Sequence, residues 1–157
     1  MGLDTGLVII IDRKLFDSNK SLKRAFRKVT YVYSWLEETD GHQGYVYHFG
    51  LNCWRNCYGI ATEINNIIHN EYRPDLKNEF YFSTDLNLEA LTKIANRLKE
   101  IINEKWWSEY ESWSSFSFKE VEKYEKFRLK RLLKIVKRLH SLDDSLLKEL
   151  TIHYYNS

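Results

Sequence analysis

The stretch Leu7-Val8-Ile9-Ile10-Ile11 is an unbroken run of apolar, mostly β-branched residues that follows Gly6. Successive side chains of a strand point to opposite faces, so a run without a polar residue is typical of a strand covered on both faces. The run is too short to cross a membrane, and its β-branched residues favour a strand over a helix. We therefore predict a central buried strand around which the rest of the fold assembles.

Two further segments with strand character follow this run. Residues 29–35 are rich in β-forming side chains, and residues 45–49 alternate in the same way after a turn signal at Asp40-Gly41. This order predicts an antiparallel hairpin with a loop longer than two residues.

Helical patterns dominate the rest of the chain. Asn52 is the predicted N-cap of a helix in which apolar residues recur at helical spacing from Trp54 onward. Asp85 or Asn87 caps a second predicted helix, and a third extends over residues 118–140. The remaining predicted elements are a basic helix or loop at 21–28, strands at 80–82 and 151–155, and a helical turn starting at Asp143.

These elements predict an α+β fold, with a small, mostly antiparallel sheet packed against three or four helices. The length of 157 residues and the absence of an internal repeat or linker favour a single compact domain over residues 1–157. Hydrophobic residues make up 43% of the chain and charged residues 29%, which excludes an intrinsically disordered protein.

The cellular location is also an expectation from the sequence. We find neither a secretory leader nor a run of about 20 apolar residues, and two cysteines do not make a disulfide scaffold. We therefore expect a cytoplasmic protein without a membrane partner.

The net charge is only +2, but the basic residues are segregated. Seven basic residues and one acid occur from Arg13 to Lys28, and seven basic residues without an acid occur from Lys126 to His140. The rest of the chain is therefore strongly acidic. This segregation predicts a positive face that attracts a phosphate-bearing ligand or partner.

The predicted helix over residues 118–140 has two arcs at 100° per residue, one apolar and one rich in lysine. Arg128, Arg131 and Arg138 lie between these arcs, where their guanidinium groups can reach a neighbouring surface or a ligand. The acids near the start of the helix also suit its dipole. An anion-binding face and an ordinary amphipathic helix are both open interpretations.

Aromatic residues make up 15% of the chain, which is more than a small core easily encloses. Trp106, Tyr110 and Trp113 follow helical spacing, and Trp107 lies beside them. This cluster indicates core packing, a partner interface or a surface on which bases stack. The excess of aromatics also suits a homo-oligomer that holds its ligand between subunits.

Arg55 falls in the first turn of the helix predicted from Asn52, where a cation opposes the helix dipole. Such an arginine pairs with a carboxylate or binds an anion. With Trp54 and Tyr58 beside it, Arg55 is a candidate contact for a phosphate or a nucleotide, and a structural salt bridge is the alternative.

Two other patterns were weighed as catalytic or metal sites. Asp4-Thr5-Gly6 matches the triplet of aspartic proteases, but that chemistry needs a second copy of the carboxylate. Cys53 and Cys57 are four residues apart on one face of the predicted helix, but a structural zinc ion needs four ligands. We therefore predict no catalytic residue, no metal and no cofactor.

A resemblance to other proteins rests on short motifs. The opening Met1-Gly2-Leu3-Asp4, the stretch Asn52–Tyr58 and the stretch Phe80–Leu86 resemble an uncharacterised group of small phage and bacterial proteins. The matching pieces cover about half of the chain. The resemblance implies a phage-like origin and no particular mechanism.

We therefore predict a phage-type accessory protein that binds a phosphate-rich ligand or partner and inhibits host defence. It would do so by sequestering a nucleotide signal or by blocking a nucleic-acid-handling host protein. The alternatives are a small nuclease or phosphodiesterase with an unrecognised site, and a purely protein–protein adaptor. The candidate ligand-binding residues are Arg24, Arg27, Trp54, Arg55, Tyr58, Trp106, Trp107, Arg128, Arg131 and Lys134.

Overall fold

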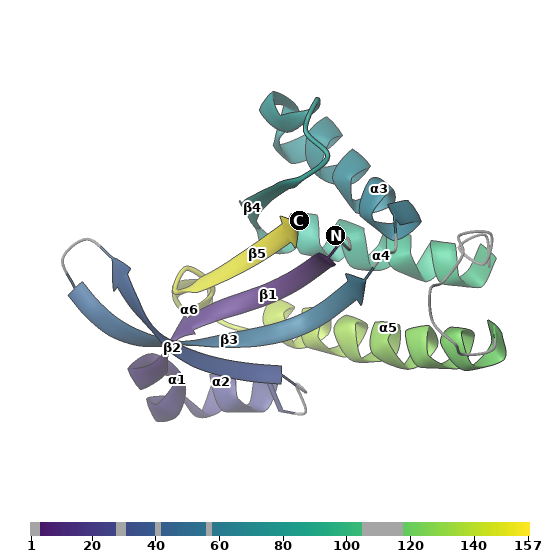
Figure 1. Cartoon of the computed structure of the whole chain (residues 1–157). Helices are drawn as coiled ribbons and strands as arrows, with labels where there is room; N and C mark the ends of the chain where they lie inside the picture. Colours follow the sequence, from purple (N-terminus) through teal and green to yellow (C-terminus); the bar gives the residue numbers. More distant parts are fainter. Residues whose placement is uncertain (1–3, 28–30, 40–41, 56–57, 105–117) are drawn as a thin grey trace.

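The computed structural model describes residues 4–27, 31–39, 42–55, 58–104 and 118–157 and has an α+β fold (Figure 1). One antiparallel sheet has the strand order β2-β3-β1-β5-β4. Its strands are β1 (Asp4–Asp12), β2 (Tyr31–Thr39), β3 (His42–Arg55), β4 (Phe82–Leu86) and β5 (Leu150–Asn156). The helices are α1 (Arg13–Ser18), α2 (Lys20–Ala25), α3 (Tyr58–Ile67), α4 (Leu88–Glu104), α5 (Phe118–His140) and α6 (Asp144–Leu147), with a π-helix η1 (Ile68–Tyr72) and a 3-10 helix η2 (Pro74–Leu76).

The predicted central strand is β1, which pairs with β3 on one side and β5 on the other. Leu7, Ile9 and Ile11 are at most 1% exposed and belong to the hydrophobic core. Val8 and Ile10 point to the opposite face and are only half-buried. One face of the sheet is thus fully covered, and the other, which we call the open face, is only partly covered.

The covered face packs against a layer of helices. Residues such as Leu91 and Ile94 of α4 and Leu132 and Leu139 of α5 are completely buried in the same core. Helices α4 and α5 pack side by side (Figure 1). Their packing places one side of α5 in the core and leaves the other side free to form part of a surface.

Several predicted elements are confirmed. The hairpin predicted around Asp40-Gly41 is β2 and β3, but the predicted loop of more than two residues is wrong, because pairing continues to Thr39 and His42 and leaves two residues between the strands. Helix α5 has the bounds predicted from the sequence. Asn87 is the cap of α4, since its Oδ1 accepts a hydrogen bond of 2.8 Å from the Ala90 amide, whereas Asp85 lies in β4. The short basic helix α2, the turn after Asp143 and the final strand β5 also form, and the strand predicted at 80–82 begins at Phe82.

The helix predicted from Asn52 is wrong at its start. Strand β3 continues to Arg55, and α3 begins only at Tyr58. The reason is that Asn52 to Arg55 find hydrogen-bonding partners on β1, from Leu7 back to Asp4, with an irregularity in register between Leu7 and Val8. Pairing with a strand that lies far away in the sequence therefore overrides the local helical spacing.

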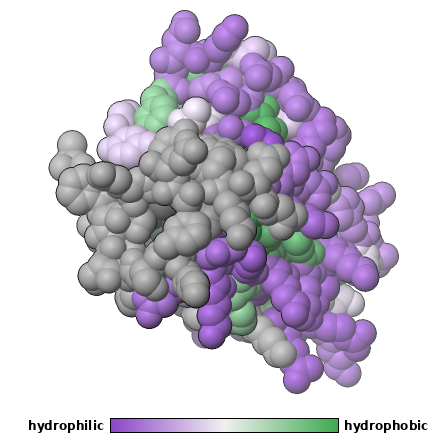
Figure 2. All heavy atoms as spheres, turned by 90° about the vertical axis from the view of Figure 1, so that its right-hand side faces the viewer, coloured by the Kyte–Doolittle hydropathy of each residue, from purple (hydrophilic) through white to green (hydrophobic). Residues whose placement is uncertain are grey.

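None of the helices in the described ranges is long and apolar enough to cross a bilayer. The face of the molecule drawn in Figure 2 is mainly hydrophilic where the chain is described, with hydrophobic residues in small patches. Scattered small patches of this kind are normal for a folded protein surface.

Candidate functional site

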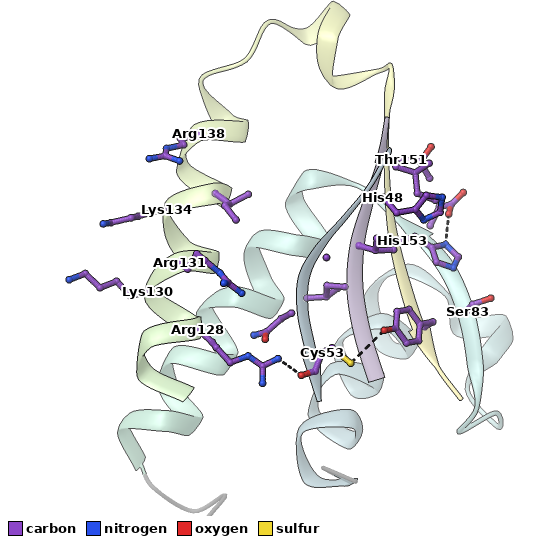
Figure 3. A pocket seen from close by; sticks show the side chains of 18 of the residues that line it. His48, Cys53, Ser83, Arg128, Lys130, Arg131, Lys134, Arg138, Thr151 and His153 are labelled. Atoms are coloured by element: carbon purple, nitrogen blue, oxygen red, sulfur yellow. Dashed lines mark hydrogen bonds and ion pairs between the residues drawn. The ribbon is translucent and has the colours of Figure 1, made fainter. Parts of the chain in front are cut away.

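A groove of about 1580 Å³ is lined by the open face of the sheet and by one side of α5 (Figure 3). Its floor includes Val8 and Ile10 of β1 and Thr151, His153 and Tyr155 of β5. Its other wall is a surface of α5 that we call the α5 stripe. The α5 stripe consists of Tyr124, Phe127, Arg128, Lys130, Arg131, Lys134, Ile135 and Arg138.

The α5 stripe follows from the helical repeat. Tyr124, Phe127, Arg131, Lys134 and Arg138 are separated by three or four residues, so their side chains lie on one side of the helix. The opposite side carries the leucines that are buried in the core. The predicted division of this helix into an apolar arc and a basic arc is confirmed.

The start of the α5 stripe is fixed to the end of β3 by Arg128. Its guanidinium group donates a hydrogen bond to the Cys53 carbonyl, pairs with the Glu125 carboxylate at 3.2 Å and lies 5.6 Å from the Trp54 ring. The Trp54 indole N–H donates to Glu125 at 3.2 Å. Burial raises the pKa of Glu125, against the opposing effect of Arg128. This cluster holds α5 and β3 together, and within it the charge of Arg128 is already paired with Glu125.

The two basic segments of the sequence meet at the other end of the α5 stripe. Arg138 donates hydrogen bonds of 3.4 and 3.2 Å to the carbonyl oxygens of Ala25, the last residue of α2, and of Arg27, two residues further along the chain. Arg27 lines the same groove, and Arg24 lines a smaller adjoining cavity of about 200 Å³ together with Arg138. Because these carbonyl acceptors are neutral, the positive charge of Arg138 is not cancelled.

Several cations of the groove form no ion pair with a described carboxylate. Within the described ranges, no carboxylate lies within 4.0 Å of Arg27, Lys130 or Lys134, in contrast to Lys126, which pairs with Glu122 at 2.8 Å. Figure 3 shows Arg128 and Arg131 directed toward the strands, whereas Lys130, Lys134 and Arg138 point away from the sheet. Positive charge therefore extends from the inner side of the α5 wall to the outer rim of the groove.

The floor contains an aromatic ring placed by a glycine. Tyr155 lies opposite Gly6 in the register of β5 and β1, and a Cβ atom on Gly6 would come within 2.3 Å of the Tyr155 ring. The missing side chain lets the ring cross β1, so that the Tyr155 hydroxyl approaches the Cys53 sulfur on β3 at 3.6 Å. A half-buried tyrosine ring thus spans the central strand, next to the carbonyl that anchors Arg128.

A histidine and a carboxylate form a second polar feature of the floor. His153 Nδ1 lies 2.8 Å from Asp85 Oδ1, and the two residues are direct cross-strand partners on β5 and β4. The His153 side chain is 28% exposed. A carboxylate at Nδ1 fixes the orientation of the ring and leaves Nε2 as the nitrogen that a ligand can reach.

The candidate residues predicted from the sequence divide into two groups. The structure brings Arg27, Arg128, Arg131 and Lys134 together in the groove, with Arg24 beside it. It does not bring Trp54 and Tyr58 there. Trp54 is 2% exposed and packs in the core, and Tyr58 stacks on Phe80 with 6.2 Å between ring centroids.

The prediction that Arg55 lies in the first turn of a helix, where it could bind an anion, is wrong, because Arg55 is the last residue of strand β3. The prediction that Cys53 and Cys57 lie on one face of a helix is wrong for the same reason, because Cys53 lies on β3. Cys57, Trp106 and Trp107 lie outside the described residues. Across the described ranges, no three histidine, cysteine or carboxylate side chains gather as a metal site would require.

Sequence reasoning missed Tyr124, Tyr155, Asp85 and His153 as groove residues. Asp85 and His153 are 68 positions apart, and only the pairing of β4 with β5 brings them together. The predicted strand at residues 151–155 did contain one indication of these residues. Because successive side chains of a strand point to opposite faces, Thr151, His153 and Tyr155 lie on the same face.

Protein-family models, curated proteins and solved structures gave no match to this chain.

Proposed function

We propose that this protein binds a phosphate-bearing ligand in the groove between the open face and the α5 stripe. The observation that carries the proposal is the meeting of the two basic segments, which the hydrogen bonds from Arg138 to Ala25 and Arg27 bring together. Arg27, Lys130 and Lys134 add charge that no described carboxylate within 4.0 Å neutralises. A hollow lined by charges of one sign concentrates anions more strongly than a flat surface does.

The two kinds of cation have different roles in this proposal. Arg131 points from α5 toward the strands, where its planar guanidinium group can bind two oxygens of one phosphate (Figure 3). Lys134 and Lys130 are exposed point charges at the rim and attract the ligand over a longer distance. Tyr155 supplies a ring on the floor for a base or another flat group.

The test uses two lysines of the same helix. Lys134 lines the groove, whereas Lys137 is also exposed on α5 but does not line it. We expect Lys134→Glu to weaken the binding of ATP and of tripolyphosphate about tenfold in isothermal titration calorimetry, which corresponds to about 1.4 kcal/mol. Lys137→Glu should change the affinity less than about twofold. Equal losses in both variants, or no binding of either anion to the native protein, would contradict the proposal.

The biological role is a further part of the proposal. A phage-type protein that sequesters a nucleotide signal or blocks a nucleic-acid-handling partner would need such a groove, and its action in the cytoplasm would keep the exposed Cys53 thiol reduced. A homo-oligomer stays a prediction. Native mass spectrometry of the protein purified from its host would report the stoichiometry and the mass of any retained ligand together.

A phosphodiesterase is the second candidate function, and the Asp85–His153 pair favours it. A histidine oriented by a carboxylate can act as a general base beside bound phosphates. Incubation with oligonucleotides, followed by denaturation, separates the two candidates, because a binder returns its ligand intact and an enzyme returns products. If cleavage occurs, His153→Ala should abolish it, whereas His140→Ala, on α5 and outside the groove lining, should not.

A further inference from the structure

The dimensions of the groove identify the class of ligand more closely, on the assumption that the proposed phosphate binding is correct. Pockets for small molecules usually enclose about 300–1,000 Å³. The groove has about 1580 Å³ and extends from Arg27 and Arg138 at one end to Tyr124 and Phe127 at the other. From Tyr124 to Arg138 the helix rises about 21 Å at 1.5 Å per residue. One nucleotide would fill only a fraction of this length.

Exposed aromatic rings lie at one end of the α5 stripe. Tyr124 is 57% exposed and Phe127 is 63% exposed. The Arg128 guanidinium carbon lies 5.3 Å from the centre of the Tyr124 ring and helps to hold that ring in place. Exposure of a large aromatic side chain to water is energetically unfavourable. Two such rings beside a row of cations therefore indicate a surface that is covered in the bound state.

The rings and the cations form an ordered series. Along α5, Tyr124 and Phe127 come first, Arg131 follows, and Lys134 and Arg138 come last, while Tyr155 adds a ring on the floor. We propose that the groove binds single-stranded nucleic acid, with bases stacked on these rings and the phosphate backbone along Arg131, Lys134 and Arg138. Proteins that bind single strands combine these two features, a basic groove and aromatic side chains.

Single strands fit this arrangement better than duplexes or acidic peptides. In a duplex the faces of the bases are stacked on one another, so aromatic side chains of the protein cannot reach them. An acidic peptide would use the cations but would gain little from Tyr124 and Phe127. Double-stranded nucleic acid and acidic peptides are therefore competing outcomes of the test.

The experiment measures the fluorescence anisotropy of labelled oligothymidylate and oligouridylate of about four and about twelve nucleotides, the range that single-strand sites cover. Tripolyphosphate, a labelled duplex and polyglutamate are the comparison ligands. We expect the longer single strands to bind most tightly. The slope of the logarithm of the binding constant against the logarithm of the salt concentration should decrease in magnitude by about 0.7 when Lys134 is replaced by Ala. DNA and RNA strands that bind equally would identify a site that does not use the 2′-hydroxyl.

Aromatic variants provide the decisive comparison. We expect Tyr124→Ala and Phe127→Ala each to weaken single-strand binding about tenfold and to leave tripolyphosphate binding unchanged. Tyr81→Ala is the matched control, because Tyr81 is 58% exposed but does not line the groove. Circular dichroism of each variant establishes that the fold is intact.

The outcomes separate this inference from the proposed function. If tripolyphosphate or duplex binds as tightly as the longer single strands, or the aromatic variants have no effect, the single-strand assignment is wrong and phosphate binding stands. If polyglutamate binds as tightly and tripolyphosphate does not bind, both proposals fail. If no anion binds to the native protein, both proposals fail.

Discussion

The two faces of the sheet differ in what their side chains do. On the covered face, Ile9 of β1 and Tyr154 of β5 have no exposed surface and contribute to the core. On the open face, the neighbouring residues Ile10 and His153 line the groove. The same strands thus carry fully buried core residues on one face and half-buried residues on the other. In the proposed function, the tyrosine, the histidine and the carboxylate of the open face lie where a ligand would bind.

A pair of adjacent isoleucines tests this difference with the largest expected effect. Ile9→Ala removes a fully buried side chain and should lower the free energy of unfolding by about 2–5 kcal/mol. Ile10→Ala removes a half-buried side chain at the groove and should cost about 1 kcal/mol. Urea denaturation of the two variants measures both values, and equal losses would remove the distinction between the faces.

The contact between Gly6 and Tyr155 allows a second test. A methyl group at residue 6 would meet the ring at 2.3 Å, so Gly6→Ala should lower the free energy of unfolding by about 1 kcal/mol as the ring is displaced. In a Tyr155→Ala background the same substitution should cost almost nothing, because the obstacle has gone. A double-mutant cycle without coupling would show that the ring does not lie over Gly6.

Glu125 allows a test at the junction of α5 and β3. Burial raises its pKa in the folded protein above the ordinary value, so the fold favours the protonated carboxyl group. That contribution to stability is complete below the unfolded pKa and is lost as the pH rises through the folded pKa. Since glutamine cannot ionise, the stability of the native protein relative to Glu125→Gln should fall as the pH rises from the ordinary glutamate pKa of about 4.3 through the raised pKa of the folded protein. Denaturation of both proteins across this range gives the difference, and a constant or rising value would contradict the assignment.

The smallest expected effect on stability concerns the cations of the α5 stripe. Lys134 and Lys137 are both exposed, and neither has a carboxylate within 4.0 Å among the described residues. Replacing either by glutamate should change the free energy of unfolding by less than about 1 kcal/mol, even though only Lys134→Glu is expected to weaken ligand binding. Thermal denaturation of the two variants checks this expectation, and a large loss at Lys134 alone would indicate a structural role.

Local sequence patterns could predict the helices and strands that need only a hydrophobic environment from the rest of the fold. The helical repeat of residues 118–140 formed a helix with the predicted bounds, and the apolar run at Leu7–Ile11 formed the predicted central strand. The expectation that this strand is covered on both faces is wrong, because Val8 and Ile10 are only half-buried. The segment from Asn52 to Arg55 did not form its predicted helix, because its backbone pairs with Asp4–Leu7 and this pairing is invisible to local spacing. The predicted helix therefore failed where a long-range contact determined the structure.

The candidate site was predictable only in part, for a related reason. Charge segregation indicated Arg27, Arg131 and Lys134, because long runs of one sign are visible in the sequence. The position of Tyr155 over Gly6 depends on the register of β1 and β5, and the Asp85–His153 contact depends on the pairing of β4 with β5. These polar and aromatic residues of the floor became candidates only when the strands were placed next to one another.

The most direct test of the ligand groove is a titration of isotope-labelled protein with single-stranded oligothymidylate of about twelve nucleotides, followed by amide chemical shifts in NMR spectra. The account predicts the largest shift changes along the α5 stripe and at Val8, Ile10, His153 and Tyr155, with small changes for core residues such as Leu91 and Ile94. Shift changes confined to α3, η1 and η2, none of which lines the groove, or no changes at all, would contradict a ligand site between the open face and α5.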